Sequence, residues 1–170
     1  LSLPVFSRDS RFVAAATENN KVAICDLATL KLKSLFADAN DPVAFSDDGC
    51  NLLTRGTNYF LRTFDVATGA IVGTVSRMTL EDVNSYAALS PDGRMLATGS
   101  INGRLMLSDA KSGAVLADFP LEGFSLIFRI EFSPDGRLMA VAGRQSESDT
   151  NGPSVKILEV ATHRLVAAPT

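Results

Sequence analysis

The sequence contains no tryptophan, a single histidine and only two cysteines among its 170 residues. Two cysteines cannot build the disulfide framework of a small secreted domain, and with one histidine they fall short of the ligand set of a usual zinc site. We expect Cys25 to be a small buried residue of an apolar strand and Cys50 to be an exposed residue after a turn. The motifs of phosphate-binding loops, dinucleotide-binding folds and the nucleophile elbow are missing as well. The sequence therefore predicts no catalytic residue, no metal and no cofactor in this chain.

An excess of positive charge and long apolar runs are also missing. The net charge is −3 at pH 7, which gives no electrostatic basis for binding nucleic acid or an anionic membrane. No apolar run reaches the roughly 20 residues that a membrane helix needs. Because residue 1 is leucine rather than methionine, we expect the chain to be a fragment of a longer multidomain protein, and we favour a cytoplasmic location.

What the sequence does contain is a repeat of about forty residues. A serine opens a turn in each of four segments, and successive serines lie 39, 44 and 43 residues apart: Ser7, Ser46, Ser90 and Ser133. An acidic residue follows each serine, after 19 residues in the first three segments and after 26 in the fourth: Asp26, Asp65, Asp109 and Glu159. Because these acids recur once per repeat, we expect them to accept hydrogen bonds from turn backbone rather than to take part in catalysis.

The third repeat indicates that each unit consists of four strands. Ser90-Pro91-Asp92-Gly93 is a hairpin turn whose glycine supplies a positive φ, and Gly49 and Gly136 occupy the equivalent position in the neighbouring repeats. Turns at residues 101–103 and 111–113 separate the next strands, which gives a four-stranded antiparallel meander. No segment has the sustained apolar period of a helix.

The predicted strands are apolar on both faces, as in residues 12–16 and 138–142, so each sheet should be covered on both sides. Four such sheets in sequence predict an all-β fold made of β-propeller blades, and a β-sandwich is the alternative. The predicted blades form one propeller segment over residues 1–170 and span about residues 3–36, 42–75, 86–119 and 128–168.

Three segments resemble the blades of WD-repeat propellers: LSPDGRMLATGSINGRLMLSDAKSGAVL from Leu89, FSPDGRLMAVAG from Phe132 and FDVATGAIV from Phe64. The family's tryptophan is replaced in the four repeats by Cys25, Phe64, Ser108 and Leu158, and its Gly-His pair is missing. In this respect the repeats are similar to the degenerate WD-like repeats of bacteria. The resemblance implies a β-propeller that acts as a non-catalytic scaffold for protein–protein interaction.

The number of repeats raises the question of how a propeller would close. Propellers span about four to eight blades, and WD-repeat domains usually have about seven. Four blades in an open arc leave the outer faces of the first and fourth blades exposed, which is a large apolar surface. Three solutions remain open: the chain is part of a propeller of about seven or eight blades, two copies pair into an eight-bladed ring, or four blades close tightly. Self-association through the terminal blades is thus one expectation.

The alternating strand directions separate two kinds of connection. The Ser-Pro-Asp-Gly and Ala-Thr-Gly turns share one end of the sheets, and loops of variable length share the other, as is typical of binding loops on a rigid scaffold. The variable end collects acidic residues that could recruit a basic or polar segment of a protein partner: Glu18, Asp38, Asp41, Glu81, Asp82, Glu122, Glu147 and Asp149. A solvated acidic face is the alternative. Asp149 lies in an insertion, residues 145–152, which we expect to be a flexible hairpin extension rather than a calcium loop.

A second function remains open, namely a fragment of a propeller enzyme of the lactonase-like or peptidase-associated kind whose catalytic residues lie elsewhere. Such enzymes place carboxylates or histidines around the mouth of the central channel. This chain offers Glu131, which we expect to pair with Arg129, and the acids of the variable loops. We expect His163 to be an exposed turn residue.

Overall fold

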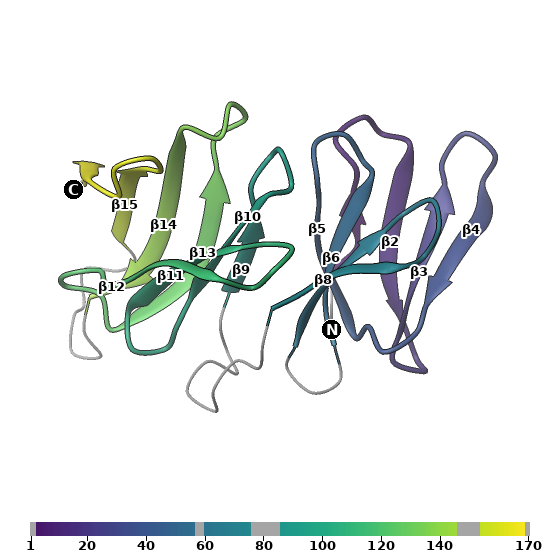
Figure 1. Ribbon diagram of the computed structural model, residues 1–170, viewed down its shortest axis with the longest axis horizontal. Coiled ribbons are helices and arrows are strands. Elements are labelled where there is room, and N and C mark those ends of the chain that lie inside the picture. The colour runs from purple at the N-terminus through teal and green to yellow at the C-terminus, as the bar shows by residue number, and fades with distance from the viewer. Residues whose placement is uncertain (1–2, 57–59, 76–85, 146–153, 169–170) are drawn as a thin grey trace. The chain divides into compact units, whose positions relative to one another are not determined.

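The structure is a computed structural model that describes residues 3–56, 60–75, 86–145 and 154–168. In this described part all regular structure is β-strand, and no helix occurs. The strands form four antiparallel four-stranded sheets, in each of which the strands pair in the order of the chain. Figure 1 shows each sheet as a simple meander. The predicted all-β fold of four four-stranded blades is confirmed.

The strand bounds follow the repeat. The first sheet consists of β1 (Val5–Phe6), β2 (Phe12–Thr17), β3 (Lys21–Asp26) and β4 (Lys31–Phe36). The second consists of β5 (Asp41–Phe45), β6 (Asn51–Arg55), β7 (Leu61–Asp65) and β8 (Ile71–Val75). The third consists of β9 (Tyr86–Leu89), β10 (Met95–Gly99), β11 (Arg104–Asp109) and β12 (Val115–Pro120). The fourth consists of β13 (Leu126–Phe132), β14 (Leu138–Arg144), β15 (Ser154–Glu159) and β16 (Leu165–Ala167).

Two strands begin earlier than their repeats predict. β5 begins at Asp41, where the expected repeat begins near residue 42, because Asp41 pairs with Arg55. β13 begins at Leu126, where the expected repeat begins near residue 128, because Leu126 pairs with Arg144. In these two sheets, the pairing between the first and second strands therefore extends into the segment that connects the sheet to the preceding one.

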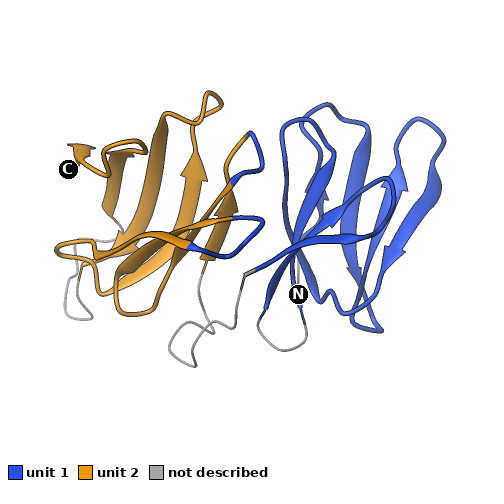
Figure 2. Ribbon diagram, viewed as in Figure 1, with its two compact units in different colours: residues 1–77, 92–94, 110–114 blue, residues 78–91, 95–109, 115–170 orange. Residues whose placement is uncertain are grey.

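The contacts within the chain divide it into two compact units (Figure 2). The first unit contains the first and second sheets together with residues 92–94 and 110–114, which are turns of the third repeat. The second unit contains all strands of the third and fourth sheets. Each unit has an apolar core of its own between two sheets.

In the core of the first unit, apolar residues at recurring positions of the repeat are buried between the first two sheets. Side chains alternate between the two faces of a strand, so Ala14 and Ile24, which are paired across β2 and β3, lie on one face. Both are fully buried and belong to one cluster with Leu52 and Phe64 of the second sheet. The rings of Phe36 and Phe64 stack with their centroids 4.7 Å apart. The first two sheets therefore pack face to face, as neighbouring propeller blades do.

The outermost strand of every sheet carries one extra residue. In the first sheet Ile24 pairs with Ser34 while Cys25 pairs with Leu32, so that Lys33 has no partner of its own. The same register shift occurs at the equivalent position of the other three sheets. The extra residues there are Val72, Leu116 and Val166. A β-bulge of this kind bends the strand and increases its local twist.

Candidate interaction surface

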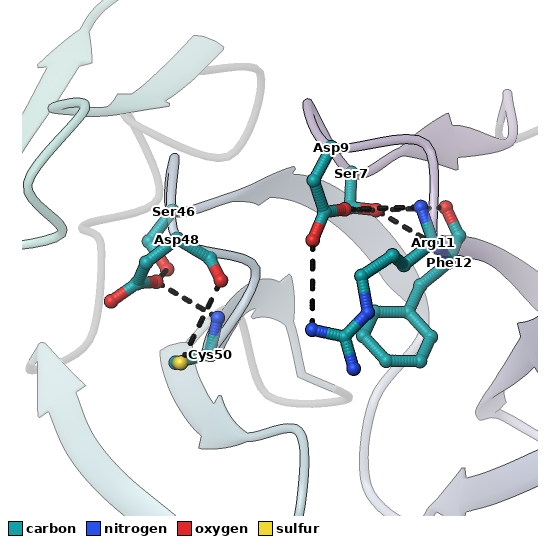
Figure 3. Close-up of polar contacts among 7 residues, drawn as sticks. All are labelled: Ser7, Asp9, Arg11, Phe12, Ser46, Asp48 and Cys50. Atoms are coloured by element: carbon teal, nitrogen blue, oxygen red, sulfur yellow. Dashed lines mark hydrogen bonds and ion pairs between the residues drawn. The ribbon is translucent and has the colours of Figure 1, made fainter.

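The serine–aspartate turn that connects the first two strands is held by its own side chains. Ser7 Oγ donates to Asp9 Oδ1 at 2.7 Å and accepts from the backbone N–H of Phe12 at 2.9 Å. Asp9 Oδ1 also accepts from the backbone N–H of Arg11 at 3.0 Å (Figure 3). The serine is buried, so its hydroxyl closes the turn from inside the sheet.

The same network recurs in the other repeats. Ser46 Oγ donates to Asp48 and Ser133 Oγ donates to Asp135, both at 2.6 Å. In the third repeat, Ser90 Oγ accepts from the backbone N–H of Met95 at 2.8 Å. The predicted positive φ is found at the turn glycines: Gly49, Gly93 and Gly136, with φ of 67°, 71° and 70°.

These contacts change the acidity of the turn carboxyl groups. The serine hydroxyl, followed by a backbone N–H, lowers the pKa of Asp9, Asp48 and Asp135 below the ordinary value. A carboxylate that accepts two hydrogen bonds is stabilised in its charged form. The carboxylates therefore serve the turn and are not left to bind a ligand.

Cys50 lies beside the second of these turns. Its pKa is raised, first by desolvation and then by the nearby carboxylate of Asp48. The thiol Sγ donates to the backbone carbonyl of Asp48 at 3.7 Å. Because the thiolate is the reactive form of cysteine, this environment opposes nucleophilic chemistry at Cys50. Cys25 is half-buried in β3 rather than fully enclosed.

The recurrent acids at the end of each third strand lie at a second turn of the same end. Asp26 Oδ1 accepts from the backbone N–H groups of Ala28 and Thr29 at 3.0 and 2.8 Å and from the Thr29 hydroxyl at 3.0 Å. The backbone N–H and the hydroxyl of Thr29 lower the pKa of Asp26. Asp65 makes the same set of contacts through residues 67 and 68, and its pKa is also lowered.

The fourth repeat departs slightly from this pattern. Glu159, one side-chain carbon longer than aspartate, accepts from the Thr162 hydroxyl at 2.7 Å. His163, in the adjoining turn, is exposed, and its ring stacks on Phe119 with the centroids 5.8 Å apart. Asp109 ends β11, the equivalent strand of the third sheet. Asp26, Asp65 and Glu159 thus each bond to the turn that carries them.

The variable loops of the first unit place two predicted acids against arginines. Arg62 Nη1 donates to the backbone carbonyl of Asp38 at 2.9 Å and lies 3.9 Å from its carboxylate. Arg55 Nη1 lies 3.7 Å from the carboxylate of Asp41. Glu18 is exposed in the turn between β2 and β3. Two of the three acids therefore hold the connection between the first and second sheets in place.

The variable loops of the second unit contain a different contact. The ammonium of Lys156 donates to the backbone carbonyl of Glu122 and lies 4.7 Å from the centroid of the Phe124 ring. The Glu122 side chain is exposed, while Phe124 is buried beneath the loop. Lys156 thus contacts the loop at the Glu122 carbonyl and at the Phe124 ring, and the Glu122 carboxylate faces solvent.

Four of the eight predicted rim acids lie outside the described residues: Glu81, Asp82, Glu147 and Asp149. The expected pair at the inner strand of the fourth sheet is present, with Arg129 Nη2 3.1 Å from Glu131 Oε2 and both side chains exposed. Arginine partners for Asp38 and Asp41 were not expected from the sequence. The only signal was that Arg55 and Arg62 flank one turn of the second repeat, at the same end as the acids.

The chemistry of the described residues is limited. Within residues 3–56, 60–75, 86–145 and 154–168, histidine, cysteine and acidic side chains do not gather in groups of three or more that could hold a metal ion. In the same ranges, no helical segment has the length and apolar character that crossing a membrane requires.

Comparison with known proteins identifies the repeat. The family model described as "WD domain, G-beta repeat" matches residues 74–109, which contain β9 to β11. WD repeat-containing protein SL1-17 of Schistosoma mansoni is 31% identical over 158 residues, which cover 90% of this chain and 48% of that protein. The chain is a WD-repeat-like β-propeller segment. It spans about half the length of the curated relative that it matches.

A solved structure shows the same fold for the WD-repeat-like chain. Hydrazine synthase from Kuenenia stuttgartiensis matches 97% of this chain and 47% of its own, with a TM-score of 0.76 and 17% sequence identity. At this level of identity the similarity establishes the arrangement of sheets alone. Proteins that share a fold of this kind host many unrelated functions.

Proposed function

We propose that this WD-repeat-like chain is a non-catalytic scaffold that binds a protein partner through its variable loops. The proposal depends on the difference between the two ends of the sheets. At the turn end, Asp9, Asp48 and Asp135 are occupied by bonds within their own turns. At the loop end of the first unit Glu18 is exposed in the turn between β2 and β3, and at the loop end of the second unit Glu122 is exposed on a loop that Lys156 contacts. Exposed side chains on firmly held loops are suited to recognition.

The acidic character of these side chains favours a partner segment with basic residues. Asp38 and Asp41 differ from Glu18 and Glu122, because Arg62 and Arg55 lie 3.9 and 3.7 Å from their carboxylates. Exposed charges of this kind contribute chiefly to the rate and specificity of association. Among the described residues, no specific contact favours the alternative function, a fragment of a propeller enzyme.

A peptide-binding experiment tests the proposal. The 170-residue chain would be screened against an immobilised peptide library of graded net charge, beside two variants that each change the net charge by +2. In Glu18→Gln/Glu122→Gln the change is at the loop end, and in Ala28→Lys/Ala67→Lys it is at exposed positions of the turn end. We expect the native chain and the turn-end variant to retain basic peptides, and the loop-end variant to bind them roughly tenfold more weakly.

Because both variants change the net charge by the same amount, the comparison separates the effect of where the charge lies from the effect of net charge. Equal weakening by both variants would indicate a non-specific effect of net charge and would contradict a site at the loop end. Retention of no basic peptide by the native chain would contradict the proposed partner chemistry.

A further inference from the structure

The first sheet has an apolar face that carries large exposed side chains. Phe6 pairs with Val13, Val13 with Cys25, and Cys25 with Leu32, so these four side chains lie on one face of the sheet. It is the face opposite to Ala14 and Ile24, which are buried in the core of the first unit. The exposed fractions are 64% for Phe6 and 60% for Leu32. We call Phe6, Val13, Cys25 and Leu32 the leading face of the first sheet.

The second sheet shows what this position of the repeat normally contacts. Its equivalent residues are Phe45, Leu52 and Phe64, which again pair in a row. Leu52 is fully buried and Phe64 is 3% exposed, and both pack in the cluster that contains Ala14 and Ile24 of the first sheet. The leading face of a sheet is therefore built to receive the other face of the preceding sheet.

The fourth sheet carries the matching surface, and its side chains are partly exposed. Ala140 pairs with Ile157 and Ala142 with Val155, and Val155 is 37% exposed. By repeat position, Ala140, Val155 and Ile157 correspond to residues of the same types in the first sheet: Ala14, Val22 and Ile24. Those three are all fully buried beneath the second sheet. We call Ala140, Val155 and Ile157 the trailing face of the fourth sheet.

We propose that two copies of this chain associate head to tail, with the trailing face of the fourth sheet of one copy packed on the leading face of the first sheet of the other. The contact continues the interface that the first and second sheets make within the chain, with the same alanine, valine and isoleucine on one side and a phenylalanine before the turn serine on the other. Each copy carries both halves, so two copies contribute eight sheets, within the range of roughly four to eight known for propellers. This association is independent of partner binding at the loop end.

Two single substitutions place a charge on one half of the contact each. Phe6→Glu alters the leading face and Val155→Glu alters the trailing face, at positions that are partly exposed in a single chain. We expect the native chain to have the mass of two copies in light scattering coupled to size exclusion. Each variant alone should have the mass of one copy, because an unpaired buried carboxylate raises the dissociation constant on the order of 100-fold.

Mixing the variants tests the head-to-tail arrangement itself. Phe6→Glu keeps an intact trailing face and Val155→Glu keeps an intact leading face, so an equimolar mixture should recover a species of two copies. Recovery also demonstrates that both variants are folded. Val115→Glu is the matched control, because Val115 is 59% exposed on β12 and lies outside both faces, and it should behave as the native chain does.

Three results would overturn the proposal. One is a native chain with the mass of a single copy at all concentrations, and another is a mixture in which the two variants remain single copies. Assemblies larger than two copies would refute the two-copy stoichiometry.

Discussion

Ser108 is a polar residue at an apolar position of the repeat. It lies in β11 where the other sheets have Cys25, Phe64 and Leu158, and it is 1% exposed. Its hydroxyl oxygen has no hydrogen-bond partner among the described residues. Burial of an unpaired hydroxyl costs about 1–3 kcal/mol. Ser108 therefore lowers the stability of the third sheet, at the position where WD repeats have tryptophan.

Replacement of this serine should stabilise the protein. We expect Ser108→Ala to raise the free energy of unfolding by about 1 kcal/mol, because it removes the unpaired hydroxyl and leaves a small cavity at most. Urea titration followed by circular dichroism would measure the change. Ser100→Ala is the control, because Ser100 is equally buried but its Oγ accepts from the backbone N–H of Arg104 at 3.0 Å. The control should lose stability, and a loss at Ser108 as well would show that its hydroxyl has a partner.

At the scale of single residues, the sequence shows which side chains repeat, but it does not show how residues that depart from the repeat are packed. The spacing shows that Ser108 is equivalent to Phe64, whereas the burial of Ser108 depends on tertiary packing. The arginine partners of Asp38 and Asp41 illustrate the same limit, because they come from different strands that only folding brings together. A list of acidic loop residues therefore does not show which of them lie beside arginines.

At the scale of elements, the turn after each third strand requires a left-handed residue. Gly69 and Gly113 supply it with φ of 74° and 73°. The first and fourth repeats use Leu30 and His163 instead, at φ of 55° and 57°. The left-handed conformation costs a residue with a side chain about 1–2 kcal/mol. Leu30 gains little in return, since 83% of its side chain is exposed.

Exchange of these residues should therefore have opposite effects. We expect Leu30→Gly to raise the free energy of unfolding by about 0.5–1 kcal/mol, because relief of the left-handed leucine exceeds the greater freedom of glycine in the unfolded chain. The reciprocal change, Gly69→Leu, should lower it by a similar amount or more. Thermal and urea unfolding of both variants would measure the difference. A destabilising Leu30→Gly would indicate that the exposed leucine makes contacts that outweigh its backbone conformation.

Turns and strands were the most predictable elements, because serine, aspartate and glycine at fixed spacing have few alternative conformations. The bulge in each outermost strand was not predicted. Val72 and Leu116 resemble ordinary strand residues in sequence, and only the pairing with β7 and β11 shows that each has no partner of its own. Register is a property of two strands, so one strand alone does not specify it.

At the scale of the molecule, the turn carboxylates couple folding to pH. Asp9, Asp26, Asp48, Asp65 and Asp135 all have pKa values below the ordinary value of 3.8. A folded-state pKa below the unfolded value contributes stability that is present above the unfolded pKa and is lost as pH falls through the folded pKa. Four of these groups lie in the first unit and Asp135 lies in the second, so acid should weaken the first unit more.

The expected pH profile follows from this sign. The free energy of unfolding should be nearly constant between about pH 7 and 5 and should fall as pH drops below about 4, measured by urea titration at each pH. Ser46→Ala removes the main cause of the low pKa of Asp48 and should reduce the fall. Ser100→Ala removes a hydroxyl whose side-chain partner, Asn102, does not titrate, so it should lower stability equally at every pH. Stability that is unchanged down to pH 3 would contradict this account.

The sequence predicts the architecture at this scale because equivalent residues recur in every repeat and form the same kind of sheet. The strands of the repeats carry apolar residues on both faces, and that pattern alone indicates sheets covered on both sides. The division into two compact units was not expected, since the repeat treats all four sheets alike. The two faces proposed to meet between copies became recognisable once burial in the first unit was known for Ala14, Val22 and Ile24.

The bulges determine which kinds of aggregate this chain can form. Lys33, Val72, Leu116 and Val166 interrupt the regular hydrogen-bonding edge of all four outermost strands. A growing fibril needs a long, flat edge to which the next chain can add in register, and a twisted, interrupted edge does not provide one. Growth by edge addition at these four strands is therefore disfavoured, although aliphatic side chains are exposed there. We therefore expect chains to associate through the faces of their sheets, and this association stops once those faces are paired.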